Sequence, residues 1–306
     1  MASREIDPSD FCHVGTRRVD SFAAAARAPI VAGAGLDGRV YVWNVRARER
    51  VREFPTIADS GGVSLALDAG GGRCFVGTYY AWGVGCIDLS IGDQIWHRTD
   101  LKRVQGMCVV PDDASVVVWF ENAAGLTLDA RTGDTRERHV GLRAFQASRL
   151  DRATLKYARQ FELTDAGGHR HKWPRDRFAL LAASFSSELC LVSESTAAVK
   201  AVALSSGRPV WTYEPRPGAH LLALDYATES AQFVGLEYAY SGAARETGPM
   251  VALLHLDSSG NVTFRRALRD WSTAVFCADA ELLLNGLGEL HDVRSGDVTH
   301  VFDVPR

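Results

Sequence analysis

The sequence predicts an all-β fold built from one repeated unit, and three observations support this prediction. Short apolar runs separated by polar corners recur along the whole chain of 306 residues. Helix-type periodicity is absent, and the one alanine-rich run, 23–26, leads directly into a strand-like segment. Corners that contain glycine return at a nearly regular interval. Together these features are typical of a β-propeller, and we expect seven blades of four antiparallel strands.

The repeated corner is clearest in "IDLSIGDQIW", at 87–96, where two strands flank a polar turn. The seven corners of this kind lie at Arg48, Gly92, Gly133, Gly168, Gly207, Gly260 and Gly296. Successive corners are 35 to 53 residues apart, about 41 on average. Asp, Ser and Thr side chains cap their own backbone, and glycine adopts positive φ without a steric clash. Each corner is therefore predicted to close the outer hairpin of a blade, with Trp96 packing between blades.

Strands predicted upstream of each corner complete the blades within one domain, 1–306. The blades are placed at 17–55, 62–99, 104–140, 141–174, 177–214, 218–267 and 271–304. The N-terminal segment 1–16, around Phe11 to Val14, is a candidate strand for closing the ring. Two stacked β-sandwiches would not require one corner every 41 residues or so. A degenerate ring of six or eight blades stays open as an alternative.

The composition is that of an ordinary folded protein, with 46% hydrophobic and 23% charged residues and a net charge of −3. This charge favours neither nucleic acid nor an anionic membrane surface as partner. No apolar run approaches the roughly 20 residues of a membrane helix. The scattered cysteines form no C-x-x-C pair, and most lie in strand-like runs. The sequence therefore predicts a cytoplasmic protein with reduced cysteines and no cofactor.

Two propeller families resemble parts of the chain. The stretch "GLDGRVYVWNV", at 35–45, resembles a blade of the WD-repeat family. The corners "SIGDQIW" and "SSGRPVW" are similar to the pyrroloquinoline quinone (PQQ) type of repeat, in which Trp follows the corner glycine by four residues. Trp96 and Trp211 occupy that position, whereas Glu137 and His300 depart from the pattern. The resemblance implies a PQQ-like or WD-repeat-like propeller. Because the vicinal cysteines usual in quinone-using members are missing, it does not imply a quinone cofactor.

The histidines of "HRHKW", at 169–173, are the weak candidates for a metal site. His169 and His171 are two residues apart on a predicted strand and share a face, so a third ligand from another blade would complete a site. Because the charged residues Arg170 and Lys172 adjoin them, the two histidines fit a solvated outer strand better than a metal site. We therefore predict no metal. The sequence motifs of α/β-hydrolases, zinc proteases and P-loop enzymes are absent, so no catalytic residue is predicted.

Connections between the second and third strands of each blade are predicted to emerge on one face of the ring. Those of blades two, three and six are rich in aromatic residues, and the last is unusually long. The candidate partner-binding residues are Tyr79, Tyr80, Trp82, Phe120, Tyr238, Tyr240 and Arg245. Glu121, Glu237 and Glu246 would form a charged rim around them. For Trp82 and Phe120, packing against neighbouring blades is an equal alternative.

These features predict a non-enzymatic scaffold or adaptor that binds a protein or peptide partner through this face and is a monomeric ring on its own. A bacterial immunity or adaptor protein is one variant, suggested by the small size and by Ala-, Arg- and Gly-rich composition. The alternative is an enzyme or small-molecule sensor that uses the central channel, with metal assistance in one variant.

Overall fold

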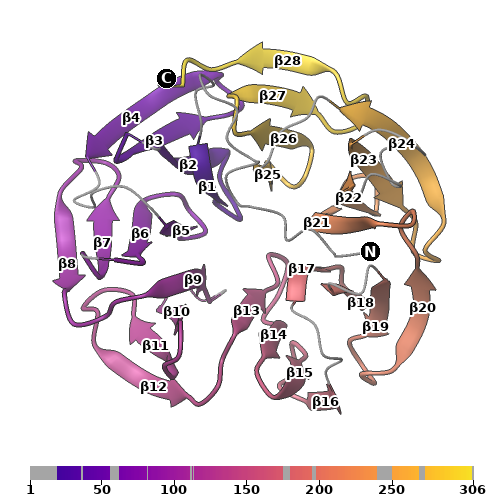
Figure 1. Ribbon diagram of the computed structural model, residues 1–306, viewed down its shortest axis with the longest axis horizontal. Helices are drawn as coiled ribbons and strands as arrows, with labels where there is room; N and C mark the ends of the chain where they lie inside the picture. Colours follow the sequence, from indigo (N-terminus) through magenta and orange to yellow (C-terminus); the bar gives the residue numbers. More distant parts are fainter. Residues whose placement is uncertain are drawn as a thin grey trace, which may run out of the picture.

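The computed structural model describes residues 19–35, 37–55, 62–80, 82–110, 112, 114–174, 180–194, 198–239, 250–268 and 273–304. These residues form 28 strands in seven four-stranded antiparallel sheets, arranged as blades around a central axis (Figure 1). The predicted fold class, an all-β propeller of seven four-stranded blades, is confirmed. Within the described ranges there is no helix that could cross a membrane.

The blades follow one another in chain order. Blade 1 contains β1 (Val19–Ala24), β2 (Ile30–Gly35), β3 (Arg39–Asn44) and β4 (Glu49–Pro55); blade 2 contains β5 (Val63–Leu67), β6 (Arg73–Thr78), β7 (Val84–Asp88) and β8 (Gln94–Arg98). Blade 3 contains β9 (Val104–Val109), β10 (Ser115–Phe120), β11 (Gly125–Asp129) and β12 (Thr135–His139); blade 4 contains β13 (Ala144–Ala147), β14 (Thr154–Tyr157), β15 (Gln160–Thr164) and β16 (Arg170–Pro174). Blade 5 contains β17 (Leu180–Phe185), β18 (Leu189–Glu194), β19 (Val199–Ala203) and β20 (Pro209–Tyr213); blade 6 contains β21 (Ala219–Ala227), β22 (Gln232–Ala239), β23 (Val251–Leu256) and β24 (Val262–Leu268). Blade 7 contains β25 (Ala274–Cys277), β26 (Leu282–Asn285), β27 (Glu289–Asp292) and β28 (Val298–Val301).

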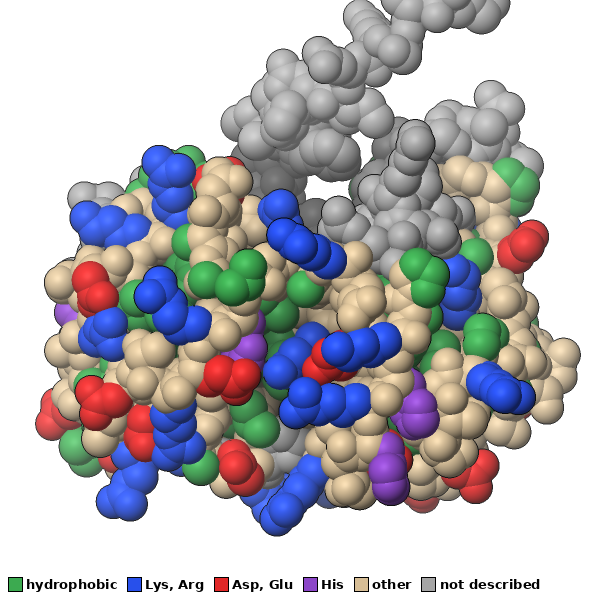
Figure 2. All heavy atoms as spheres, turned by 90° about the horizontal axis from the view of Figure 1, so that it is seen from below, with side chains coloured by type: hydrophobic (Ala, Val, Ile, Leu, Met, Phe, Trp, Pro, Cys, Tyr) green, Lys and Arg blue, Asp and Glu red, His purple; other side chains and the backbone are tan. Residues whose placement is uncertain are grey.

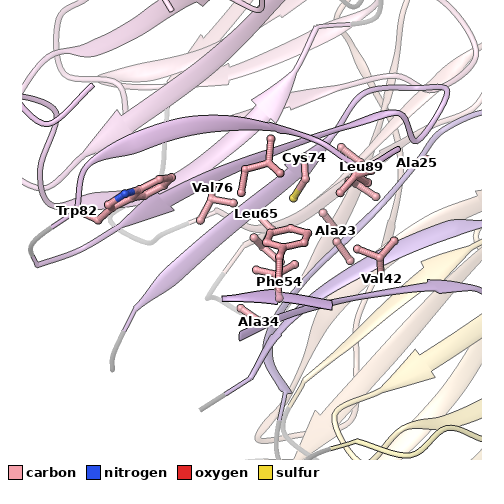
Figure 3. Packing of buried hydrophobic residues seen from close by; sticks show 14 residues of the cluster. Ala23, Ala25, Ala34, Val42, Phe54, Leu65, Cys74, Val76, Trp82 and Leu89 are labelled. Carbon is pink, nitrogen blue, oxygen red and sulfur yellow. The ribbon is translucent and has the colours of Figure 1, made fainter. Parts of the chain in front are cut away.

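The first strand of each blade lines the central channel and the fourth forms the rim (Figure 1). Middle strands such as β6 are buried on both faces, because alternate side chains point to the two neighbouring blades. The hydrophobic core therefore lies between blades. Figure 3 shows Ala34, Val42 and Phe54 of blade 1 meeting Leu65 and Cys74 of blade 2.

The ring closes where blade 7 meets blade 1. The backbone N–H of Val19 donates to the carbonyl of Gly286 at 3.2 Å, and the Thr273 hydroxyl donates to the carbonyl of Val19 at 2.7 Å. The rings of Trp43 and Phe302 lie 5.9 Å apart across the same boundary. In the described part of the chain, both blades consist of consecutive strands. The candidate closure segment, 1–16, lies outside the described residues.

The seven predicted corners all connect the third and fourth strands of a blade, as expected, and all have positive φ. The six glycines have φ between 63° and 87°, and Arg48 has φ of 58°. Left-handed backbone of this kind suits glycine because it has no Cβ. The weakest copy of the repeat, at Arg48, is therefore the same turn without its glycine.

The tryptophans that follow two of the corners bridge blades. Trp96 donates its indole N–H to the carbonyl of Ala130 in the next blade at 3.1 Å, and its ring covers Gly133. Trp211 repeats this contact with Ser258 at 2.8 Å. The predicted inter-blade packing of Trp96 is confirmed.

Replacing Arg48 by glycine should raise the free energy of unfolding by about 0.5–1 kcal/mol, because relief of the left-handed strain exceeds the entropic cost of glycine. Urea denaturation of the variant and the native protein measures this difference. Arg50→Gly, on the adjacent strand β4, is the control and should destabilise the protein instead. A loss of stability in Arg48→Gly would contradict the equivalence of this turn to the other six.

Candidate functional site

The β6–β7, β10–β11 and β22–β23 connections are second-to-third strand connections, as the sequence predicted. We call the side of the ring that carries them the loop face. Because successive strands run antiparallel, the first-to-second and third-to-fourth connections emerge on the opposite face. Of the predicted site residues, Tyr240 and Arg245 lie outside the described residues.

A pair of tyrosines in the β6–β7 connection is the most prominent feature of the loop face. Tyr80 is 65% exposed, and its ring meets that of Tyr79 edge to face at 4.8 Å. The Tyr79 hydroxyl donates a hydrogen bond to the carboxylate of Glu121 in blade 3. This hydrogen bond raises the pKa of Tyr79 above its ordinary value. An exposed ring is thus backed by a second ring that is tied to the next blade.

The backbone around this pair is also tied across the two blades. The N–H of Tyr79 donates to the carbonyl of Gly62 at 3.0 Å, and the N–H of Arg103 donates to the carbonyl of Tyr79 at 2.9 Å. The N–H of Glu121 then donates to the carbonyl of Arg103 at 3.0 Å, and the two side chains lie 3.7 Å apart as an ion pair. These bonds order the surface before any partner binds, which lowers the entropic cost of binding.

Tyr79 lines a cavity of about 680 Å³ that is formed largely by the first strands of blades 1 to 5, at the mouth of the central channel. Its lining includes Tyr79, Gln105, Trp119, Arg143 and Gln146. The Trp119 ring covers Gly106 on β9 so closely that any Cβ there would clash with it. The cavity therefore combines an indole with amide and guanidinium hydrogen-bonding groups.

Sequence reasoning chose Phe120 for this region and missed Trp119. Val116 and Val118 face blade 2, and Phe120 follows them into the same core. Trp119 points to the other side of β10, near blade 4, where Phe145 packs. The signal was present in the strand alternation, since two adjacent residues of a strand face opposite sides.

Three predicted partner-binding rings are buried in the core. Their exposed fractions are 6% for Trp82, 5% for Phe120 and 7% for Tyr238. Trp82 stacks on His97 with ring centroids 4.3 Å apart, and lies at the edge of the cluster in Figure 3. In this conformation these rings offer almost no area to a partner. Tyr79 and Tyr80 are the predicted aromatic residues that reach the described surface.

Glu237 does not lie in an exposed rim, and this expectation was wrong. Its side chain is fully buried and accepts a hydrogen bond from the Arg216 guanidinium. Arg265 lies 3.3 Å away, and the Tyr213 hydroxyl donates to the carboxylate at 3.2 Å. Burial, reinforced by Glu237, raises the pKa of Tyr213 to about 12. The group joins blades 5 and 6, because a buried carboxylate requires paired cations and hydrogen-bond donors.

The two candidate metal ligands, His169 and His171, make separate contacts with other residues. His169 lies in the β15–β16 turn, where its Nδ1 is 3.0 Å from the Asp165 carboxylate. His171 is on β16 and packs over the corner Gly207 of blade 5. Among the described residues, no group of three or more His, Cys, Asp or Glu side chains could hold a metal ion.

On the opposite face, the channel contains a second cavity of about 440 Å³ with walls of mostly small and aliphatic side chains. Arg149, in the β13–β14 connection of blade 4, extends to two other blades. Its guanidinium lies 2.8 Å from the Asp225 carboxylate of β21 and donates to the carbonyl of Phe276 at 3.3 Å. Arg149 is therefore a cross-link between blades 4, 6 and 7.

No protein-family model matches this chain, and no curated protein is significantly similar to it in sequence. The fold therefore stands on the structure itself. The resemblance to the PQQ-type family stands on the corner residues alone, and the resemblance to the WD-repeat family stands on the segment 35–45.

Proposed function

We propose that this propeller is a non-enzymatic scaffold or adaptor that binds a protein or peptide partner through its loop face. One observation carries the proposal: Tyr80 is 65% exposed, yet the hydrogen bond between Tyr79 and Glu121 holds its supporting ring in place. Rigid aromatic side chains bury much area at little entropic cost, and they are frequent anchors in protein interfaces.

The surroundings of the tyrosine pair favour a peptide-like partner. The adjacent cavity offers the Trp119 ring together with Gln105, Arg143 and Gln146. A chain segment has both apolar side chains for the rings and carbonyl groups for the amide and guanidinium donors. Propellers commonly serve as interaction scaffolds, which adds support by analogy.

Several finer assignments belong to this proposal. The bridging contacts of Trp96 and Trp211 support a PQQ-like repeat, and the segment at 35–45 supports a WD-like one. Four further points stay predictions: partner binding by Tyr240 and Arg245, a monomeric state, a cytoplasmic location, and a role as a bacterial immunity or adaptor protein. The alternative function, an enzyme or small-molecule sensor that uses the central channel, also stays a prediction.

The test is affinity purification from the native host with quantitative comparison of Tyr80→Ala and the native protein. We expect recovery of the specific partner to fall about tenfold, the effect of losing roughly 1.4 kcal/mol of binding free energy. Ile91→Ala is a matched control, because Ile91 is 62% exposed and lies in the β7–β8 corner on the opposite face.

Equal recovery of the same partners by the native protein and Tyr80→Ala would contradict the proposed surface. Loss of the partner in Ile91→Ala alone would move the site to the opposite face. Tyr80 is a cleaner probe than Tyr238, because a change at the buried Tyr238 also disturbs the core between blades 6 and 7.

A further inference from the structure

The cavity beside Tyr79, which we call the loop-face cavity, contains an unpaired positive charge. Among the described residues that line it, Arg143 is the one charged residue, and none is Asp or Glu. In the described part of the chain, no carboxylate pairs with the Arg143 guanidinium. Arg149, in the cavity of the opposite face, is by contrast paired with Asp225 at 2.8 Å. The Arg143 guanidinium is therefore available to an anion from outside the protein.

The backbone places Arg143 on the side of blade 4 that faces Trp119. Arg143 directly precedes β13, and its N–H donates to the carbonyl of Tyr157 on β14 at 2.8 Å, which extends the strand pairing to it. Residues two apart on a strand face the same side, so Arg143 shares a side with Phe145. Phe145 packs in the cluster that includes Trp119 of blade 3. The cation and the indole thus lie on the same side of this wall.

Trp119 adds a second donor that the protein leaves unsatisfied. Among the described residues, none accepts a hydrogen bond from its indole N–H. The indole nitrogens of Trp43 and Trp82 also lack a partner, but they are buried, whereas that of Trp119 is accessible. A neutral donor and a charged donor therefore line one cavity without a described acceptor, which favours a ligand that carries acceptor oxygens.

Two glutamine side chains complete the polar part of the cavity. The pairing of β9 with β10 skips Gln105, which is left without a partner on the neighbouring strand. Such a bulge re-aims a side chain, and Gln105 lines the cavity. Gln146, on β13 of the next blade, lines it as well. A side-chain amide both donates and accepts hydrogen bonds, as the backbone of a bound peptide requires.

The outer wall of the same blades has a different charge pattern. Figure 2 views the ring from the side where β12 and β16 lie in Figure 1, and shows acidic and basic side chains next to each other. The ammonium of Lys172, for example, lies 3.1 Å from the Glu162 carboxylate. Charges on this wall are paired within the protein, whereas the charge in the loop-face cavity is not.

The position of the cavity suits the end of a chain. It lies at the mouth of the channel, where the first strands of five blades surround it. Its volume of about 680 Å³ is within the range of pockets that enclose a small ligand, roughly 300–1,000 Å³, so a few residues can enter. A chain end enters such a space once, whereas an internal segment would have to enter and leave through the same mouth.

We propose that the loop-face cavity binds the carboxyl-terminal end of the peptide partner, with the terminal carboxylate at the Arg143 guanidinium. A guanidinium and a carboxylate form short, charge-assisted hydrogen bonds in a defined geometry. The Trp119 ring offers an apolar surface to the last side chains, and Tyr80 contacts residues that precede them. This inference rests on the proposed function and specifies which part of the partner binds.

The direct test is an array of peptides attached through their N-termini, with the last four positions randomised. Each peptide is made with a free terminal carboxylate and as the terminal amide. We expect the native protein to select a subset of the free acids. Fluorescence anisotropy with the tightest peptide should show that its amide binds at least about tenfold more weakly.

Replacing Arg143 by glutamine should weaken binding of the free acid at least about tenfold and change binding of the amide less than about twofold. The matched control is Arg159→Gln, because Arg159 is an exposed arginine in the β14–β15 connection, on the loop face of the same blade but outside the cavity lining. This control should bind both peptides as the native protein does. The comparison of acid with amide uses the native protein, so it stands even if a variant fails to fold.

Three results would overturn the proposal. The first is the absence of peptide binding to the array, and the second is equal affinity for the acid and the amide. The second result includes amides that bind through an internal Asp or Glu. The third is an equal effect of Arg143→Gln and Arg159→Gln.

Affinity purification from the native host separates this inference from the proposed function. Loss of the partner in both Tyr80→Ala and Arg143→Gln would support both. Loss in Tyr80→Ala alone would overturn the carboxylate site and leave the loop face as the binding surface. Full recovery in both variants would contradict the proposed function itself.

Discussion

Replacing Gly133 by valine should lower the free energy of unfolding by about 3 kcal/mol or more. Gly133 has φ of 76°, a conformation that is strained for a β-branched residue. A Cβ at this position would lie 2.7 Å from the Trp96 ring. That ring cannot move away without losing its hydrogen bond to Ala130 and its contact with Phe75. Backbone strain and overpacking therefore add.

The two contributions can be separated by one substitution at two corners. Gly168 has φ of 87° but open space around its Cβ position, so Gly168→Ala should cost about 1 kcal/mol, from strain alone. Gly133→Ala should cost clearly more, because it also displaces Trp96. Equilibrium urea denaturation of both variants measures the difference. Equal losses would show that Trp96 does not constrain this corner.

Replacing Arg149 by alanine should lower the free energy of unfolding by about 2 kcal/mol at neutral pH. The guanidinium is 2.8 Å from the Asp225 carboxylate, whose side chain is 11% exposed. Removal of Arg149 leaves this buried carboxylate without its cation and breaks the bond to the carbonyl of Phe276. We expect blades 4, 6 and 7 to be less firmly joined in this variant.

The loss should depend on pH in a defined direction. Burial raises the pKa of Asp225, and Arg149 opposes that rise. Since a raised pKa means that the folded state holds the proton more tightly than the unfolded chain, this carboxyl contributes less stability as pH rises through its folded pKa. Without Arg149 the pKa rises further. The destabilisation by Arg149→Ala should therefore be smaller near pH 4 than near pH 7.

Thermal denaturation at both pH values checks this expectation. Adding Asp225→Asn to Arg149→Ala should recover part of the stability at neutral pH, because the amide needs no cation. Arg152→Ala, an exposed arginine on the same connection, should change stability little. An Arg149→Ala loss that does not vary with pH would contradict a role for the Asp225 charge.

Two residues of the candidate site, Tyr79 and Tyr80, could be placed at the surface from the sequence because their position depends on local order along the chain. The exposed Tyr80 and the partly exposed Tyr79 lie in a connection between two apolar strands, which the sequence shows directly. Trp82 and Phe120 could not be separated from them without a structure, because each ring can face solvent or a neighbouring blade. Their burial depends on side chains from other strands, such as His97 for Trp82.

The sequence by itself determined the repeated four-stranded unit, the position of every corner and the left-handed turn at the glycine corners, whereas it left six or eight blades open beside the seven that the structure shows. It could do so because turns depend on a few adjacent residues and because strand alternation has a fixed period. Only the tertiary structure decided that Glu237 is a buried partner of Arg216 and Arg265, and that the corner at Gly168 is uncovered. These features depend on which blade faces are adjacent and on how completely side chains distant in sequence fill the space between them.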